Sequence, residues 1–283
     1  CPMLSMKGKL FGDLTVACLN EEEFIVFGSG AAQEAHRRWF ENHLDSFNVN
    51  YTNRSDDFHG LAIAGPRSRD LLKKIVNEDV SNNTFKFRDT KRMFVAGVPA
   101  IVNRISFTGE LGYEIYVAPH YQLKLYEEIE NAGREFSIKP FGSRALMSMR
   151  LEKNWGAWTL DYRSDFTAKE SGLDIFIDWN KDFIGKESAM NDDSNLKLTS
   201  LMVKTSDIDV TNNEAVMKKD KSIGYITSGG YAHYVRKSIA FSYLDEADIN
   251  SGEDIQVEIN GDLYDSIIVS EPLYDPSGKK MRT

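Results

Sequence analysis

The pattern of hydrophobic residues changes at about residue 195, and this change constrains the fold more than any other feature. Before it, apolar residues either alternate, as in strands, or recur at helical spacing. After it, short β-rich runs are separated by turn residues, as in a small antiparallel barrel or sandwich. Residues 191–195 have the most linker-like composition. We therefore expect two domains, residues 1–195 and 196–283, which also suits a length of 283 residues.

The first region is predicted to have an α+β structure. Residues 12–17 and 23–27 are interpreted as the two strands of a hairpin, and a helix follows in which Ala31, Ala35 and Trp39 recur every four residues. A second strand pair is expected on either side of the glycine-containing turn at residues 108–112. Further segments follow the same patterns, with a strand at 61–64 and helices at 71–76, 125–132 and 143–152.

Composition and charge exclude several classes of function. No run of residues approaches the roughly 18 apolar residues that a membrane span needs, so we do not expect a membrane protein. The net charge of -9 argues against a nucleic-acid partner. The two cysteines, Cys1 and Cys18, and the five histidines have no metal-ligand spacing, so no metal site is predicted and a reducing compartment is the default.

The segment Gly28-Ser29-Gly30 follows a predicted strand and opens a predicted helix. A dinucleotide-binding loop has this arrangement, which would make the chain part of a nucleotide-binding oxidoreductase. Gln33 stands where the third glycine is required, however, and no second βαβ unit follows. We therefore prefer a tight strand-to-helix turn.

Two carboxylates are candidates for chemistry. Asp13 lies among apolar residues, where an ionised carboxylate is costly to desolvate, although an edge-strand charge would explain it too. Glu114 alternates with Tyr113 and Ile115, so it faces the opposite side of its strand. A carboxylate there could accept two parallel hydrogen bonds from a pterin, or it could simply be solvated.

Arg150 falls on the apolar side of its predicted helix, where a guanidinium usually has a carboxylate or a ligand as its partner. A structural ion pair and a ligand contact are both open interpretations. An aromatic cluster follows that could line a ring-binding cavity or belong to the core; it comprises Trp155, Trp158, Tyr162 and Phe166.

The order of these features resembles the aminomethyltransferase family, which includes the glycine-cleavage T-protein. Residues 3–14 resemble the family segment that ends in a catalytic Asp-Leu, and residues 107–114 resemble its aromatic-Thr-Gly-Glu-x-Gly-x-Glu motif. Arg150-Leu151-Glu152 resembles its Arg-Leu-Glu helix. The resemblance implies a folate-binding domain, incomplete at its N-terminus, followed by a small antiparallel β-barrel.

A finer similarity is to the C-terminal, folate-binding part of dimethylglycine and sarcosine dehydrogenases. Glu152-Lys153 with Trp158 resembles that branch, as do residues 182–187, 224–231 and 272–276. Two departures from the T-protein pattern also favour it. Gly12 stands where T-proteins have an acidic residue, and Gly28 stands where they have Asn.

The resemblance implies tetrahydrofolate-dependent transfer of a one-carbon unit from an oxidised methylated amine, giving 5,10-methylene-tetrahydrofolate. Asp13 would be the catalytic carboxylate and Glu114 would hold the pterin. The rest of the folate pocket would include Phe107, Arg150, Trp158 and Tyr231.

FAD is expected only in a missing N-terminal half or in a partner subunit. The expected location is the cytoplasm, or the mitochondrial matrix in a eukaryote. The alternative function is a folate-binding regulatory protein without turnover.

Overall fold

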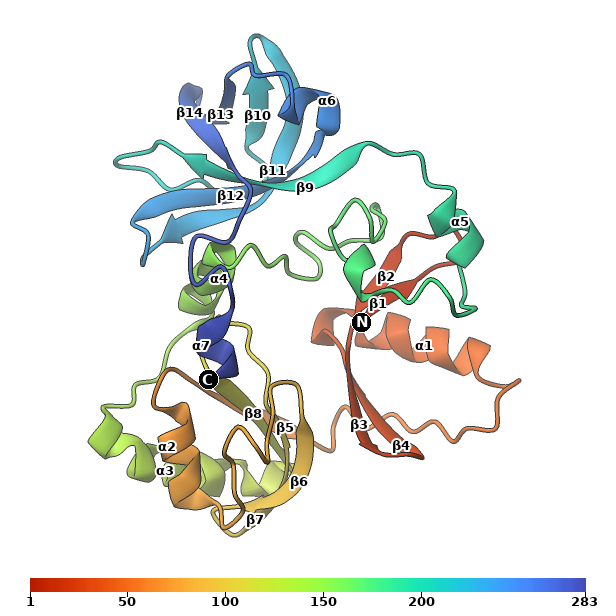
Figure 1. Ribbon diagram of the computed structural model, residues 1–283, viewed down its shortest axis with the longest axis vertical. Helices are drawn as coiled ribbons and strands as arrows, with labels where there is room; N and C mark the ends of the chain where they lie inside the picture. Colours follow the sequence, from red (N-terminus) through yellow and green to blue (C-terminus); the bar gives the residue numbers. More distant parts are fainter. The chain divides into compact units, whose positions relative to one another are not determined.

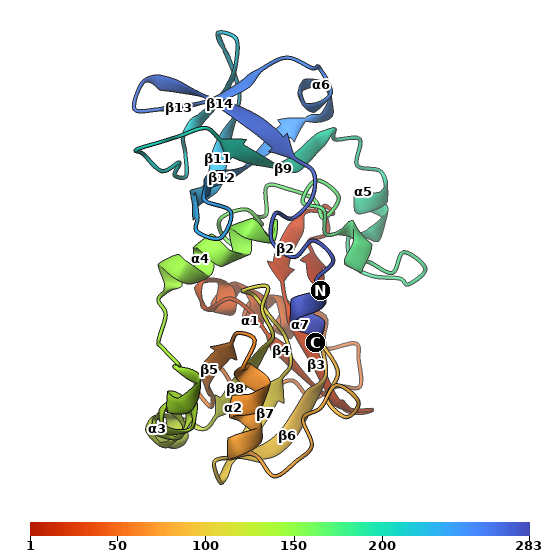
Figure 2. The same cartoon turned by 60° about the vertical axis from the view of Figure 1, so that its left-hand side comes forward.

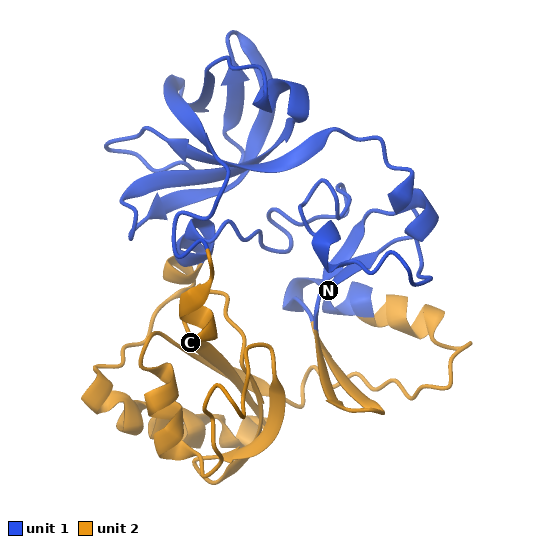
Figure 3. Ribbon diagram, viewed as in Figure 1, with its two compact units in different colours: residues 1–15, 28–36, 147–276 blue, residues 16–27, 37–146, 277–283 orange.

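A computed structural model describes all residues, 1–283. The chain divides into two compact units (Figure 3). The first unit contains residues 1–15, 28–36 and 147–276. The second contains residues 16–27, 37–146 and 277–283. Helices α1 (Gln33–His43) and α4 (Ser143–Glu152) run from one unit into the other, so each unit is assembled from separate stretches of chain. No helix is both long and apolar enough to cross a membrane.

The second unit is built on a four-stranded antiparallel sheet (Figure 2). Alternation along the strands buries Ile63, Val102 and Ile115, and the helices that pack with the sheet add Leu72 and Leu125 to the same core. The strands in spatial order are β5 (His59–Ala64), β8 (Gly112–Val117), β7 (Val98–Asn103) and β6 (Thr90–Val95), and the helices are α2 (Ser68–Ile75) and α3 (Gln122–Gly133).

The barrel at the top of Figure 1 belongs to the first unit. Six antiparallel strands close on themselves around an interior that includes Leu201, Val216 and Val257. The antiparallel barrel expected after residue 195 is therefore confirmed. Its strands in spatial order are β10 (Ala215–Lys218), β11 (Lys221–Ala232), β12 (Lys237–Asp245), β9 (Leu196–Val203), β14 (Asp262–Val269) and β13 (Ile255–Ile259).

The N-terminal strands differ from the expected hairpin. Gly12 and Asp13 belong to β2 (Leu10–Asp13), which pairs with β1 (Pro2–Leu4). The hairpin itself joins β3 (Thr15–Asn20) to β4 (Glu23–Phe27). The expected strand at residues 12–17 is therefore divided at Leu14, whose peptide N–H donates to the Cys1 carbonyl at 3.0 Å.

Short helices complete the chain. Three of them are α5 (Lys186–Met190), α6 (Glu246–Ile249) and α7 (Lys279–Arg282), and the 3₁₀ turns are Gly30–Ala32, Pro119–Tyr121, Arg134–Phe136 and Asp174–Phe176. The segment at Gly28 follows β4, which pairs only with β3 in a two-stranded sheet. It therefore lacks the parallel βαβ setting of a dinucleotide-binding loop, and the tight strand-to-helix turn is the correct interpretation.

Candidate functional site

Asp13 ends strand β2 in the first unit, directly after the buried Gly12. Although 36% of its side chain is exposed, burial raises the pKa of the Asp13 carboxyl. Burial raises the pKa of the Tyr162 phenol, and the charge of the nearby Asp13 carboxylate raises that pKa further. The Asp13 carboxylate is thus partly desolvated, and the field of a partly desolvated charge is stronger than that of a fully hydrated one.

Glu114 lies in the second unit, on the face of β8 opposite the buried Tyr113 and Ile115. The alternation expected for this strand is confirmed. The Tyr116 hydroxyl donates to Glu114 Oε2 at 2.6 Å, and the Tyr116 ring stacks on Phe27 with centroids 4.4 Å apart. Burial raises the pKa of Glu114. Its other oxygen, Oε1, has no hydrogen-bond partner within the chain, so it can accept from a ligand N–H.

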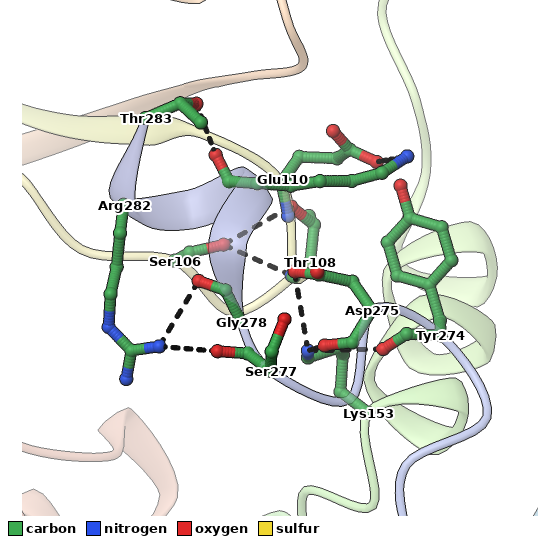
Figure 4. Close-up of polar contacts among 12 residues, drawn as sticks. Ser106, Thr108, Glu110, Lys153, Tyr274, Asp275, Ser277, Gly278, Arg282 and Thr283 are labelled. Carbon is green, nitrogen blue, oxygen red and sulfur yellow. Dashed lines mark hydrogen bonds and ion pairs between the residues drawn. The ribbon is translucent and has the colours of Figure 1, made fainter.

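The turn before β8 has its own side-chain hydrogen bonds (Figure 4). Ser106 Oγ accepts from the Gly109 N–H at 3.0 Å, and Thr108 Oγ1 accepts from the Glu110 N–H at 3.2 Å. Gly109 has φ +83°, a conformation that favours glycine. The half-buried Phe107 lies in this turn, so the motif holds it at a fixed place ahead of Glu114.

Arg150 is 1% exposed and makes a buried ion pair. Its guanidinium donates to Asp161 Oδ2 at 2.6 Å and to the Trp155 carbonyl at 3.0 Å. Asp161 is fully buried and also accepts from the hydroxyls of Thr227 and Ser228 in the barrel. Of the two interpretations that the sequence left open for Arg150, these contacts are those of a structural ion pair. A folate contact for Arg150 stays a prediction.

Trp158 and Tyr231 are the other expected pocket residues of the first unit. Trp158 is half-buried, and its ring centroid lies 6.0 Å from that of His36. Tyr231 is 36% exposed near the end of β11. Its ring lies at 81° to that of His233, and its carbonyl accepts from Ser148 Oγ at 2.7 Å. The charge of Asp13 raises the pKa of Tyr162 and the charge of Arg150 lowers it, so these two expected residues both lie near the Tyr162 phenol.

Sequence reasoning did not predict the partners of Glu152 and Lys153. Lys153 is 2% exposed, and its ammonium donates to the carbonyls of Tyr274 at 3.1 Å and Asp275 at 2.6 Å (Figure 4). Glu152 accepts from the Tyr234 N–H at 2.7 Å. Two of the motifs that carried the finer resemblance, Glu152-Lys153 and residues 272–276, therefore meet, since the end of α4 binds the segment that follows the barrel.

Two clefts lie elsewhere. One, of about 610 Å³, is lined by Met6 and residues 182–188, 190 and 191 of the first unit. The other, of about 460 Å³, lies in the second unit, where Arg54, Arg92 and Tyr116 line it. Asp13 and Glu114 line neither cleft. No group of three or more His, Cys, Asp or Glu side chains is arranged to hold a metal ion.

Family comparisons match both parts of the chain. The model of the GCVT N-terminal domain matches residues 1–181, and the model of the glycine cleavage T-protein C-terminal barrel domain matches residues 197–275. The chain belongs to the glycine cleavage T-protein family. The resemblance to aminomethyltransferases stated from the sequence is thereby confirmed. A solved member, the glycine cleavage system aminomethyltransferase T from Bartonella henselae, has the same fold, with a TM-score of 0.85 and 19% identity over 97% of this chain and 75% of that one.

Curated relatives from this family fall into more than one branch. Human mitochondrial dimethylglycine dehydrogenase is 37% identical over 96% of this chain. The alignment covers 32% of that enzyme, so the chain spans about a third of the length of this relative. The aminomethyltransferase of Thermoanaerobacter pseudethanolicus is 27% identical over 98% of this chain and 76% of its own.

Proposed function

We propose that this member of the T-protein family binds tetrahydrofolate and transfers a one-carbon unit to it, giving 5,10-methylene-tetrahydrofolate. The observation that supports this most is the hydrogen bonding of Glu114. Tyr116 occupies one carboxylate oxygen, and the other is left for a ligand. A folate fits this acceptor, because its pterin presents N–H groups that can donate to a carboxylate oxygen.

In this proposal Asp13 is the catalytic carboxylate. Its carboxylate is partly desolvated, so it can orient the attacking amine, accept the proton that the amine loses, and stabilise the cationic character of the incoming carbon. Glu114 orients the pterin, and Phe107, Trp158 and Tyr231 are proposed to line the ring-binding surface.

Arg150 would act in this pocket through its ion pair with Asp161, which holds the segment that carries Trp158. We place the folate-binding domain in residues 1–195. The barrel domain, residues 196–283, would contribute a wall and stability.

The proposed donor is the iminium or formaldehyde product of dimethylglycine or sarcosine oxidation. Its carbon forms bonds to two nitrogens of tetrahydrofolate, and the demethylated amine or water leaves with the two hydrogens that those nitrogens lose. The similarity to dimethylglycine dehydrogenase supports this donor over the glycine-derived one. Amine oxidation would then require FAD in a further part of a longer protein or in a partner subunit. In a eukaryote the proposed location is mitochondrial, as it is for the human dimethylglycine dehydrogenase.

The first test measures folate binding. We expect Glu114→Gln in the full-length protein to weaken tetrahydrofolate binding by about 1 to 3 kcal/mol in calorimetry, because the variant loses the charge and one acceptor. Glu127→Gln, on the exposed face of α3, is the matched control and should bind as the wild type does. Unchanged affinity in Glu114→Gln would remove the pterin assignment.

The second test separates the enzyme from a folate-binding regulator. Asp13→Asn keeps the shape of the side chain but removes its charge, so transfer should fall by roughly a hundredfold or more while folate affinity falls modestly. Asp56→Asn, an exposed carboxylate, is the control. Methylene-tetrahydrofolate formation is measured with amine oxidation followed separately. Transfer at the wild-type rate in Asp13→Asn would favour the regulator.

A further inference from the structure

His36 is the one buried residue of helix α1, with 5% of its surface exposed. Its ring nitrogen Nε2 lies 3.0 Å from the Phe11 carbonyl of strand β2. Because a carbonyl can only accept, Nε2 must carry the hydrogen of this bond. The imidazole is therefore a donor to the strand two residues before Asp13.

Two glycines from different segments make room for this ring. A Cβ at Gly12 would lie 2.9 Å from Nε2, and a Cβ at Gly28 would lie 3.1 Å from Nδ1. Neither glycine has a positive φ, so the available space, rather than the backbone conformation, calls for glycine here. Gly30 provides the contrast, because a Cβ there would meet nothing within 4 Å.

The His36 ring lies where it can hold the Asp13 carboxylate in position. Strand β2 belongs to a two-stranded sheet with β1, and beyond β1 its start is held by the Leu10 N–H, which donates to the Phe166 carbonyl at 2.8 Å. The hydrogen bond from His36 and its close packing on Gly12 hold that strand at residues 11 and 12. Trp158 supports the ring, with centroids 6.0 Å apart and planes inclined at 52°.

We propose that His36 is a positioning residue for one-carbon transfer, which sets the place of the Asp13 carboxylate through the Phe11 carbonyl and the backbone of Gly12. The proposal rests on the function proposed above. A misplacement of about 1 Å in a reacting group can lower a rate by roughly a hundredfold, so a ring that holds the strand at residues 11 and 12, next to Asp13, makes the rate sensitive to that ring. Gly12 and Gly28 then act as partners of His36, because they admit the ring to the strand.

Substitutions that change the ring or the space around it test this role. His36→Phe keeps an apolar ring but removes the donor, and His36→Gln restores an N–H donor on a flexible chain. Gly28→Ala crowds the His36 ring and the Leu14 side chain, both at 3.1 Å, and makes these neighbours of Asp13 shift by a few tenths of an ångström. Gly30→Ala is the matched control in the same segment.

The measured quantity is the fraction of oxidised dimethylglycine carbon captured as methylene-tetrahydrofolate, against free formaldehyde, in the full-length protein. Amine oxidation and tetrahydrofolate affinity are followed alongside. We expect kcat for transfer to fall roughly tenfold or more in His36→Phe and severalfold in Gly28→Ala, with folate affinity within about twofold of the wild type. His36→Gln should recover part of the loss, and Gly30→Ala should match the wild type.

A double variant distinguishes positioning from general loss of packing. If Gly12→Ala acts by displacing the ring, it should lower transfer strongly alone but add little to His36→Ala, because the ring is already gone. Additive effects would overturn the pairing of Gly12 with His36.

Asp13→Asn separates a failure of this inference from a failure of the function. Wild-type transfer in Asp13→Asn refutes the proposed function itself. If Asp13→Asn abolishes transfer while His36→Phe and Gly28→Ala transfer normally, the positioning role alone is refuted. Should His36→Phe fail to fold, Gly28→Ala compared with Gly30→Ala decides the matter.

Discussion

Asp161 is expected to be among the most sensitive positions for stability. It is fully buried and accepts from Arg150, the Ala157 N–H at 2.9 Å, and the hydroxyls of Thr227 and Ser228. In Asp161→Asn the amide oxygen can still face Arg150, while the new NH₂ group donates to the hydroxyls, which can accept as well as donate. The count of hydrogen bonds can therefore be kept, and the lost quantity is the negative charge.

That charge has a large effect because Arg150 is 1% exposed. Removing one partner of a buried pair typically lowers the free energy of unfolding by about 3 to 5 kcal/mol, since it leaves the other charge buried without compensation. We expect about 3 kcal/mol for Asp161→Asn and about 5 kcal/mol for Asp161→Ala, which also loses the acceptors. Adding Arg150→Met to Asp161→Asn should restore part of the loss, because the uncompensated cation is then gone.

Urea unfolding of the full-length protein, followed by tryptophan fluorescence, measures these differences, because Trp155 and Trp158 lie between the two residues of the ion pair in the chain. The control is Asp165→Asn, whose side chain is 69% exposed and lies 3.4 Å from Arg163. An exposed pair of this kind contributes less than about 1 kcal/mol. If Asp161→Asn lowers stability no more than Asp165→Asn does, the buried ion pair does not hold this region together and the reasoning is wrong.

Three further predictions concern other positions. Burial raises the pKa of Glu114 above its ordinary 4.5, so the folded state keeps a proton that the unfolded state has released, and this contribution to stability is lost as pH rises through the folded pKa. Urea titrations from about pH 4 to pH 8 should show Glu114→Gln gaining stability relative to the wild type with rising pH, and a constant difference would contradict this. A Cβ at Gly156 would lie 2.5 Å from two atoms of the Tyr162 ring, so Gly156→Ala should lower the free energy of unfolding by about 1 to 3 kcal/mol, whereas Gly142→Ala, with open space, should not. A chain ending at Asn195 removes Thr227, Ser228 and Tyr243 from Asp161 and should give a non-cooperative thermal transition in circular dichroism; full transfer by such a chain would show the barrel to be dispensable.

Features with local causes could be predicted from the sequence. The face of β8 that carries Glu114 and Tyr116 follows from alternation with Tyr113 and Ile115, because a strand turns successive side chains to opposite sides. The antiparallel β structure after residue 195 follows from its short apolar runs and turn residues, which left a barrel or a sandwich open. In both cases the residues that decide the outcome are neighbours in the chain, so the sequence alone is sufficient.

Features that depend on distant partners could not. The division at Leu14 depends on pairing between β2 and the first residues of the chain, which no local pattern reveals. The role of Asp161 depends on Arg150, 11 residues away, and on Thr227, 66 residues away. Its only local sign was a carboxylate within the aromatic run from Trp158 to Tyr162. His36 likewise had no metal-ligand spacing, and its meaning depends on two glycines from separate segments.

The discontinuous composition of the two units affects how the chain can fold during synthesis. The first unit needs residues 1–15 together with residues up to 276, and the second unit includes residues 277–283. Neither unit can therefore be completed until the ribosome has passed residue 276. Contacts between residues so far apart in sequence form slowly, because long loops must close first. Strand β2 and its Asp13 are thus synthesised well before Tyr162 and the barrel, and during that interval the exposed apolar surface is available to chaperones or to aggregation.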